Sequence, residues 1–255
     1  MNIKLNLLTI LLLLVMQGKA QQFINKGTIE FEVVTNEKKK MPDRSYLEDL
    51  KATMPTFKTA YYNYSFAANK SIYKFNHYDD TKAKVPEFLR NGDDLNEWYT
   101  DFSEGITYIQ KSIWDMPFNL KDSIKNIHWK LSNERRKIAG FDCRKAVGII
   151  MDSVYVFAFY TDEIVISGGP CTLHGLPGMI LGVTIPRLYT SILATKLMVN
   201  DTKENTIKPI SAKKFYTSTE LKKILDDRLS NQGNDNEESE DNKNWKNQLY
   251  WNLLL

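Results

Sequence analysis

The stretch DCRKAVGII at residues 142–150, followed by SVYVFAFY at residues 153–160, decides the fold, because it predicts two strands joined near Met151 and Asp152. In the second strand aliphatic residues alternate with aromatic residues, so both of its faces are apolar. Such a strand is covered on both sides, or it faces a core on one side and an apolar cavity on the other. In the second case, the side chains that would face a ligand are Tyr155, Phe157 and Phe159.

Strand patterns also occur on both sides of this pair. Residues 27–35 alternate between apolar and polar side chains, as a half-buried strand does. Further strands are expected within residues 61–75, 97–102, 106–112, 129–136, 179–185 and 191–199, and helices within 43–53 and 219–229. Strands and helices do not alternate along the chain, so the sequence predicts a mainly β (α+β) fold. We expect one curved antiparallel sheet, a half-barrel, with two or three helices packed on one side.

The N-terminus is typical of a secretory signal peptide. Lys4 precedes a mostly apolar run from Leu5 to Met16, and Gly18 and Ala20 place small residues where signal peptidase requires them. We therefore expect export to the periplasm or the cell exterior after cleavage near Ala20. The expected parts of the chain are a signal peptide at 1–20, a single β-rich domain at 21–230, an acidic flexible linker or loop at 231–244, and an apolar C-terminal segment at 245–255.

Charge and composition exclude several classes of protein. The chain has 255 residues, with 34 Lys and Arg against 31 Asp and Glu, and a formal net charge of +3. Without the two lysines of the first twenty residues, 32 basic residues face 31 acidic residues, a net charge of +1. This balance gives no electrostatic reason to expect a nucleic acid partner. The sequence predicts contact with a membrane only through the export signal.

The most distinctive motif is GGPCTLHGLPGMIL at residues 168–181. Its residues 176–179 fit a type II turn, because proline presets the first central dihedral angle and glycine adopts the positive φ of the second. An apolar strand is expected to begin directly after this turn. The residues of the predicted corner are Gly175, Leu176, Pro177 and Gly178.

With this motif the chain resembles the GLPGLI family of exported proteins from Bacteroidota. The match is GLPGMIL at residues 175–181, and the segments at 138–146 and 159–164 are also similar to the family. The family has no established activity or agreed catalytic residues, so the resemblance implies none for this chain. It implies a half-barrel like that of periplasmic lipoprotein carriers, with helices plugging the concave side.

The two cysteines, Cys143 and Cys171, admit more than one interpretation. After export to an oxidising compartment, a disulfide between them is the first expectation. It would close a loop of about 28 residues and stabilise the fold by roughly 3 kcal/mol. Alternatively, Cys171 and His174 have the spacing of metal ligands and Cys143 could join them, a set that suits copper or zinc. The third alternative is that both thiols stay unpaired.

Signatures of common enzymes are absent from the sequence. It contains no Gly-x-Ser-x-Gly elbow, no His-Glu-x-x-His motif and no phosphate-binding loop. We therefore predict no catalytic residues and no cofactor, and expect an exported envelope protein that binds a hydrophobic ligand or a protein partner without catalysis. The alternatives are a periplasmic protein that handles copper or zinc through Cys143, Cys171 and His174, and an unrecognised hydrolase.

Overall fold

A computed structural model describes residues 23–41, 45–82, 84–90, 92–113, 116–199, 202–232, 246–248 and 250–251. The predicted signal peptide and residues 233–244 of the predicted linker lie outside the described residues. Within the described part of the chain, no helix combines the length and the apolar character that a membrane crossing needs.

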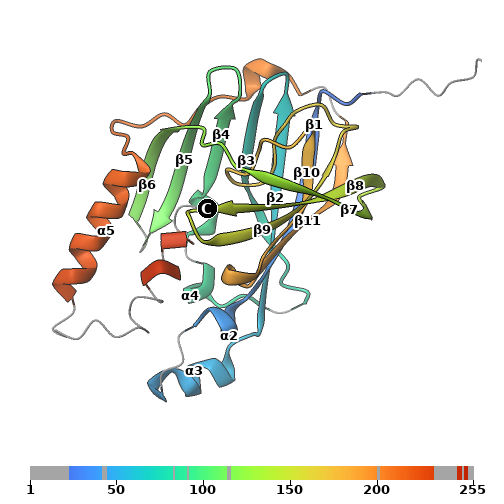
Figure 1. Cartoon of the computed structure of the whole chain (residues 1–255). Helices are drawn as coiled ribbons and strands as arrows, with labels where there is room; N and C mark the ends of the chain where they lie inside the picture. The colour runs from blue at the N-terminus through green and yellow to red at the C-terminus, as the bar shows by residue number, and fades with distance from the viewer. Residues whose placement is uncertain are drawn as a thin grey trace, which may run out of the picture.

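The described residues form one sheet of eleven strands (Figure 1). Its neighbours, from edge to edge, are β6-β5-β4-β3-β2-β1-β11-β10-β9-β8-β7. The strands are β1 (Lys26–Asn36), β2 (Phe57–Ala67), β3 (Lys70–Tyr78), β4 (Glu97–Asp101), β5 (Ile106–Ile113), β6 (Met116–Ser123), β7 (Trp129–Ile138), β8 (Phe141–Ile150), β9 (Val154–Thr161), β10 (Met179–Ile185) and β11 (Thr190–Met198). The α-helices are α2 (Glu37–Lys40), α3 (Glu48–Thr53), α4 (Glu87–Arg90) and α5 (Ser218–Gln232).

Two meanders make up the sheet. Strands β1 to β6 pair in sequence order, and so do β7 to β11, with every pairing antiparallel. The first strand joins the two meanders by pairing with the last, as in the register Phe31 to Ala194. The sheet is open, since β6 and β7 are its two edges. This architecture confirms the predicted mainly β fold with one antiparallel sheet and few helices.

The curvature of the sheet brings its two halves over one core. Strands β7, β8 and β9 pass in front of the other half of the sheet in Figure 1. Buried residues of both halves accordingly belong to a single cluster, which includes Phe31, Tyr64 and Val156, each at most 1% exposed. Burying these apolar side chains together is the main favourable contribution to folding.

A long loop, as well as a helix, fills the space inside the curved sheet. Helix α5 contributes Leu221 and Leu225 to the core, as its helical spacing predicts. The connection between β9 and β10 contributes four more buried side chains, Ile164, Ile166, Leu173 and Leu176. The resemblance implied that helices plug the concave side, and here the connection between β9 and β10 supplies part of that filling as well.

Two local predictions differ from the structure. The predicted single strand at 61–75 is the β2–β3 hairpin, which turns at Ala68 with a positive φ of 50°. Both strands are rich in aromatic residues, so the sequence on either side of Ala68 has the pattern of one continuous strand. Residues 38–40 are three consecutive lysines, a pattern that predicts a solvated turn, but they belong to the short helix α2. The Asn36 side chain caps this helix by accepting a hydrogen bond from the Lys39 N–H at 3.0 Å.

Candidate functional site

A cavity of about 480 Å³ lies where β4 and β5 meet residues 168–178, which we call the glycine-rich loop. Its walls come from these two strands, the β6–β7 connection, the β8–β9 turn and residues 169–174. The apolar lining includes Phe102, Ile109, Ile124, Ile127, Ile149, Ile150, Met151 and Leu173, and the polar lining includes Asp122, Lys125, His128, Asp152, Cys171 and His174. An enclosure of this size with mixed walls is typical of a small-molecule site.

The glycine-rich loop is held to the sheet by hydrogen bonds of its own backbone. The Trp129 indole N–H donates to the His174 carbonyl at 2.8 Å, and the Ser167 hydroxyl donates to the Leu176 carbonyl at 2.6 Å. The Ile180 N–H donates to the Gly168 carbonyl at 2.8 Å. These contacts fix the cavity wall that carries Cys171 and His174.

The proline-glycine corner differs from the predicted turn type. Gly178 has the expected positive φ, at 129°. However, its N–H donates to the Leu176 carbonyl at 2.7 Å, which closes a three-residue γ-turn around Pro177 rather than a four-residue type II turn. Leu176 is only 2% exposed, so the corner buries its apolar side chain. Gly175 also has a positive φ, at 90°, and strand β10 begins at Met179 as predicted.

The structure separates the three candidate metal ligands. Cys171 and His174 line the cavity, whereas Cys143 is buried within β8 and donates to the Phe141 carbonyl at 3.6 Å. Among the described residues, no three His, Cys, Asp or Glu side chains form a group that could hold a metal ion. Both cysteines are free thiols in this structure, so the predicted disulfide is not formed in it.

The environments of the thiols lead to a prediction about their reactivity. Burial raises the pKa of Cys143 to about 12 and that of Cys171 to about 11, from an ordinary value of 9.0. We therefore expect the native protein to react with iodoacetamide at neutral pH at least about a hundredfold more slowly than a free cysteine, because the thiolate is the reactive form. After denaturation without reductant, two thiols per chain should react. Mass spectrometry of the alkylated chain counts them, and a count of zero would show that the two cysteines form a disulfide.

Of the aromatic residues predicted to face a ligand, Tyr155 and Phe157 alternate with the fully buried residues of β9, whereas Phe159 is itself buried and belongs to the core cluster. Val154, Val156 and Ala158 are fully buried, while Tyr155 is 54% exposed. Cationic side chains cover the other two rings: the Lys145 ammonium lies 5.4 Å from the ring centre of Phe157, and the Arg136 guanidinium lies 4.7 Å from that of Phe159. The cavity lining does not include Tyr155, Phe157 or Phe159.

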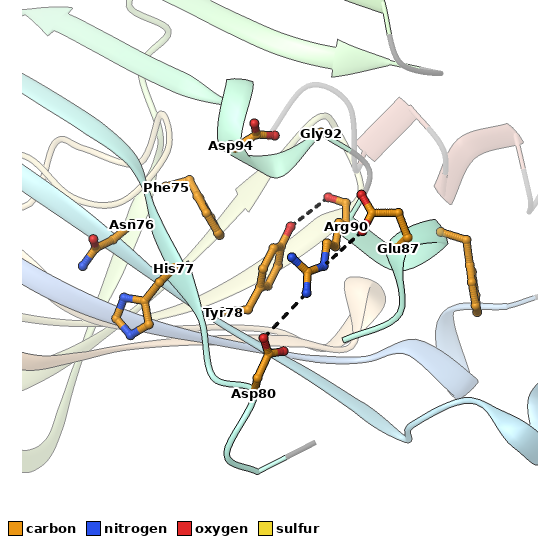
Figure 2. Close-up of a pocket in the computed structure, with 10 residues that line it drawn as sticks. Phe75, Asn76, His77, Tyr78, Asp80, Glu87, Arg90, Gly92 and Asp94 are labelled. Atoms are coloured by element: carbon orange, nitrogen blue, oxygen red, sulfur yellow. Dashed lines mark hydrogen bonds and ion pairs between the residues drawn. The ribbon is translucent and has the colours of Figure 1, made fainter. Parts of the chain in front are cut away.

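A second hollow, of about 1050 Å³, lies between the end of β3 and α4 (Figure 2). Arg90 lies between two carboxylates there, 3.6 Å from Asp80 and 3.7 Å from Glu87. Its guanidinium is 4.9 Å from the ring centre of Tyr78, whose hydroxyl donates to the Arg90 carbonyl at 3.0 Å. Paired charges thus occupy the walls of this hollow.

Beneath this hollow lies a buried charge cluster, which we define as Glu37, Lys58, Asp93 and Tyr78. The Lys58 ammonium donates to Asp93 Oδ2 at 2.9 Å and to the Leu89 carbonyl at 3.0 Å, and lies 3.8 Å from Glu37 Oε1. The Tyr78 hydroxyl donates to the same Asp93 oxygen at 3.0 Å, and burial, with this carboxylate, raises the pKa of Tyr78.

Sequence reasoning missed this cluster. The available signal was Lys58, which occupies an inward position of an aromatic strand, in step with Ala60, Tyr62 and Tyr64. A lysine in such a position needs a buried partner, but the sequence does not tell which carboxylate supplies it.

Comparison with known proteins extends the fold assignment. Residues 115–225, less than half of the chain, match the family described as N-glycanase peptide, N-terminal domain. The structure of PNGF-II in a C2 crystal form has a TM-score of 0.51 and 11% identity, over 78% of this chain and 32% of that chain. At this identity the likeness shows the fold alone: the chain has the fold of a PNGase F-like N-terminal domain, with no function assigned by it.

Two further solved structures are more distant. PNGF-II in a P21 crystal form has a TM-score of 0.49 and 12% identity, over 79% of this chain and 33% of that one. An uncharacterized conserved protein from Thermus thermophilus has a TM-score of 0.37 and 8% identity, over 74% of this chain and 89% of that one. The present chain spans about a third of the length of the PNGF-II chains. No curated protein matches the sequence.

Proposed function

We propose that this chain is an exported, non-enzymatic binding protein that holds a hydrophobic ligand in the cavity beside the glycine-rich loop. The observation that carries the proposal is the cavity itself, of about 480 Å³. Five isoleucines and a leucine line it, and two of these, Ile109 and Leu173, are buried to 5% and 2% exposure. Removing the apolar surface of a ligand from water against such walls is favourable.

The resemblance to the GLPGLI family and the similarity to an N-terminal domain support this proposal in different ways. The resemblance to the GLPGLI family supports export, because members of that family are exported and residues 1–20 of this chain are expected to form a signal peptide. The second is a similarity to one domain of a longer protein, since only 32% of the PNGF-II chain is covered. A domain that has its own hydrophobic core and a cavity is suited to binding a ligand. An envelope protein as partner is the alternative to a small ligand.

A binding assay with an uncharged fluorescent dye, N-phenylnaphthylamine, tests the proposal. We expect saturable binding to the wild-type chain, and Thr172→Trp should weaken it by about tenfold or more, because the larger side chain fills the cavity. Thr184→Trp, the same change on the exposed face of β10 beside Phe157, should leave the affinity within about twofold.

Two outcomes would reject the cavity as a hydrophobic site. The first is the absence of saturable dye binding by the wild-type chain. The second is equal loss of affinity in both tryptophan variants, since Thr184 lies outside the cavity lining. Either result would leave the protein-partner alternative as the better account of the fold.

A further inference from the structure

The inner faces of β4 and β5 continue past the cavity toward the buried charge cluster. Side chains of one face alternate along a strand, so Trp98 and Thr100 share a face of β4, and Phe102 comes directly after the strand. By the same rule Thr107, Ile109 and Lys111 share a face of β5. Thr100, Phe102, Thr107 and Ile109 line the cavity. The next positions on these two faces are Trp98 and Lys111, roughly 7 Å further along each strand.

Lys111 is a largely buried lysine whose ammonium has no ion-pair partner among the described residues. The residue is 9% exposed, and its ammonium lies 4.7 Å from the ring centre of Trp98. Among the residues that the structure describes, no hydrogen bond or ion pair reaches this ammonium. The indole nitrogen of Trp98, 4% exposed as a residue, is likewise buried without a hydrogen-bond partner. A buried donor without an acceptor is unusual because it costs free energy, and here it lies beside a cation without an ion-pair partner among the described residues.

The titratable groups that influence Lys111 electrostatically do not provide a free anion to pair with its ammonium. They are Cys171, Asp93, Lys40 and Lys58. Asp93 already accepts hydrogen bonds from Lys58 and Tyr78. Burial raises the pKa of Cys171 to about 11, so this thiol is neutral at physiological pH. Burial is also the main reason why the pKa of Lys111 falls to about 8, a value that still leaves most of the amine protonated at neutral pH.

We propose that Lys111 binds the carboxylate of an amphiphilic acid whose apolar chain occupies the cavity. This inference rests on the proposed function and names the class of ligand for the same site. The ammonium supplies a charge-assisted hydrogen bond to the carboxylate, and the adjacent indole N–H is the second donor available there. Cys171 lines the cavity and also influences Lys111 electrostatically, which places the cation near the cavity wall.

Competition against bound N-phenylnaphthylamine by dodecanoic acid and by dodecanol tests this inference. The two competitors share their chain and differ in the charge of the head group. We expect Lys111→Met to weaken displacement by the acid about 10- to 100-fold, and to leave displacement by the alcohol unchanged. Lys121→Met, the same change at an exposed lysine outside the cavity lining whose ammonium lies 5.2 Å from the ring centre of Tyr108, is the control and should affect neither competitor. Lys125→Met tests whether a lysine of the cavity lining binds the head group instead.

Each outcome has a definite meaning. If the acid competes equally well with wild type and Lys111→Met, the inference is wrong and the hydrophobic site remains. If Lys125→Met instead weakens the acid, the head group lies at the exposed end of the cavity and the inference is also wrong. If the dye does not bind the wild-type chain, the proposed function fails, and this inference fails with it.

A measurement on the wild-type protein covers the case in which Lys111→Met does not fold. Acetylation of lysines by acetic anhydride near pH 8, followed by peptide mass spectrometry, reports the accessibility of each amine. Dodecanoic acid should slow the acetylation of Lys111 about tenfold relative to dodecanol, because the bound carboxylate holds the ammonium in its protonated form. Equal rates with acid and alcohol would overturn the inference.

Discussion

Replacing Gly178 by alanine should prevent the chain from reaching its native structure, or destabilise it by more than about 4 kcal/mol. A Cβ at this position would lie 2.0 Å from the Thr161 carbonyl oxygen, which belongs to the backbone of β9. Thr161 pairs with Met179 at the start of β10, so the clash could be relieved only by disrupting that pairing. The φ of 129° adds backbone strain for any residue with a side chain.

Urea denaturation followed by circular dichroism measures this effect, and Gly140→Ala is the matched control. Gly140 also has a positive φ, at 89°, but a Cβ there would meet no atom within 4 Å. The control should therefore cost only the backbone term, about 1–2 kcal/mol. Similar unfolding midpoints for the two variants would show that the approach of Thr161 to Gly178 does not constrain the fold.

The second large effect is expected at Asp93. Asp93→Asn preserves the shape of the side chain but removes the negative charge that lies 2.9 Å from the buried Lys58 ammonium. The Lys58 ammonium then keeps only the more distant carboxylate of Glu37, at 3.8 Å, and because a poorly compensated buried charge is costly we expect a loss of about 3 kcal/mol in the free energy of unfolding. The Tyr78 hydroxyl, which donates to the same oxygen at 3.0 Å, keeps an acceptor in this variant.

A double-mutant cycle separates the ion pair from other effects. Lys58→Met alone should also destabilise the protein, since it leaves the Asp93 carboxylate buried without its cation. The double variant should lose at least about 1 kcal/mol less than the sum of the two single losses, because the second change removes the orphaned partner. Strict additivity would mean that Lys58 and Asp93 contribute independently.

Most of the sheet could be predicted from the sequence because its strands alternate. The strand expected at 27–35 is β1, the hairpin expected at 97–112 is β4 and β5, and the helix expected at 219–229 is α5. For α5 the sequence also predicts Ser218 or Thr219 as the N-terminal cap, because both have short hydroxyl side chains, and this prediction is wrong. Thr217 is the cap, in a capping box where its hydroxyl accepts from the Glu220 N–H at 3.1 Å and the Glu220 carboxylate accepts from the Thr217 N–H at 2.7 Å.

The parts that escaped prediction depend on contacts between distant segments. The pattern of β9 permitted a cavity on its aromatic face, and the cations of the neighbouring β7 and β8, Arg136 and Lys145, cover two of those rings instead. The partners of Lys58 and the isolation of Lys111 follow from the way α2, α4 and β5 are brought together. No local periodicity encodes these arrangements, because they are set by tertiary packing.

The pairing of β1 with β11 also determines when the fold can be completed. Every other neighbouring pair of strands is consecutive along the chain, so each meander can form from short-range contacts as it is synthesised. Joining the meanders requires Phe31 to meet Ala194, and contacts of such separation form slowly. The sheet is therefore completed only after nearly the whole chain has left the ribosome. A protein that we propose crosses a membrane before folding gains time from this delay.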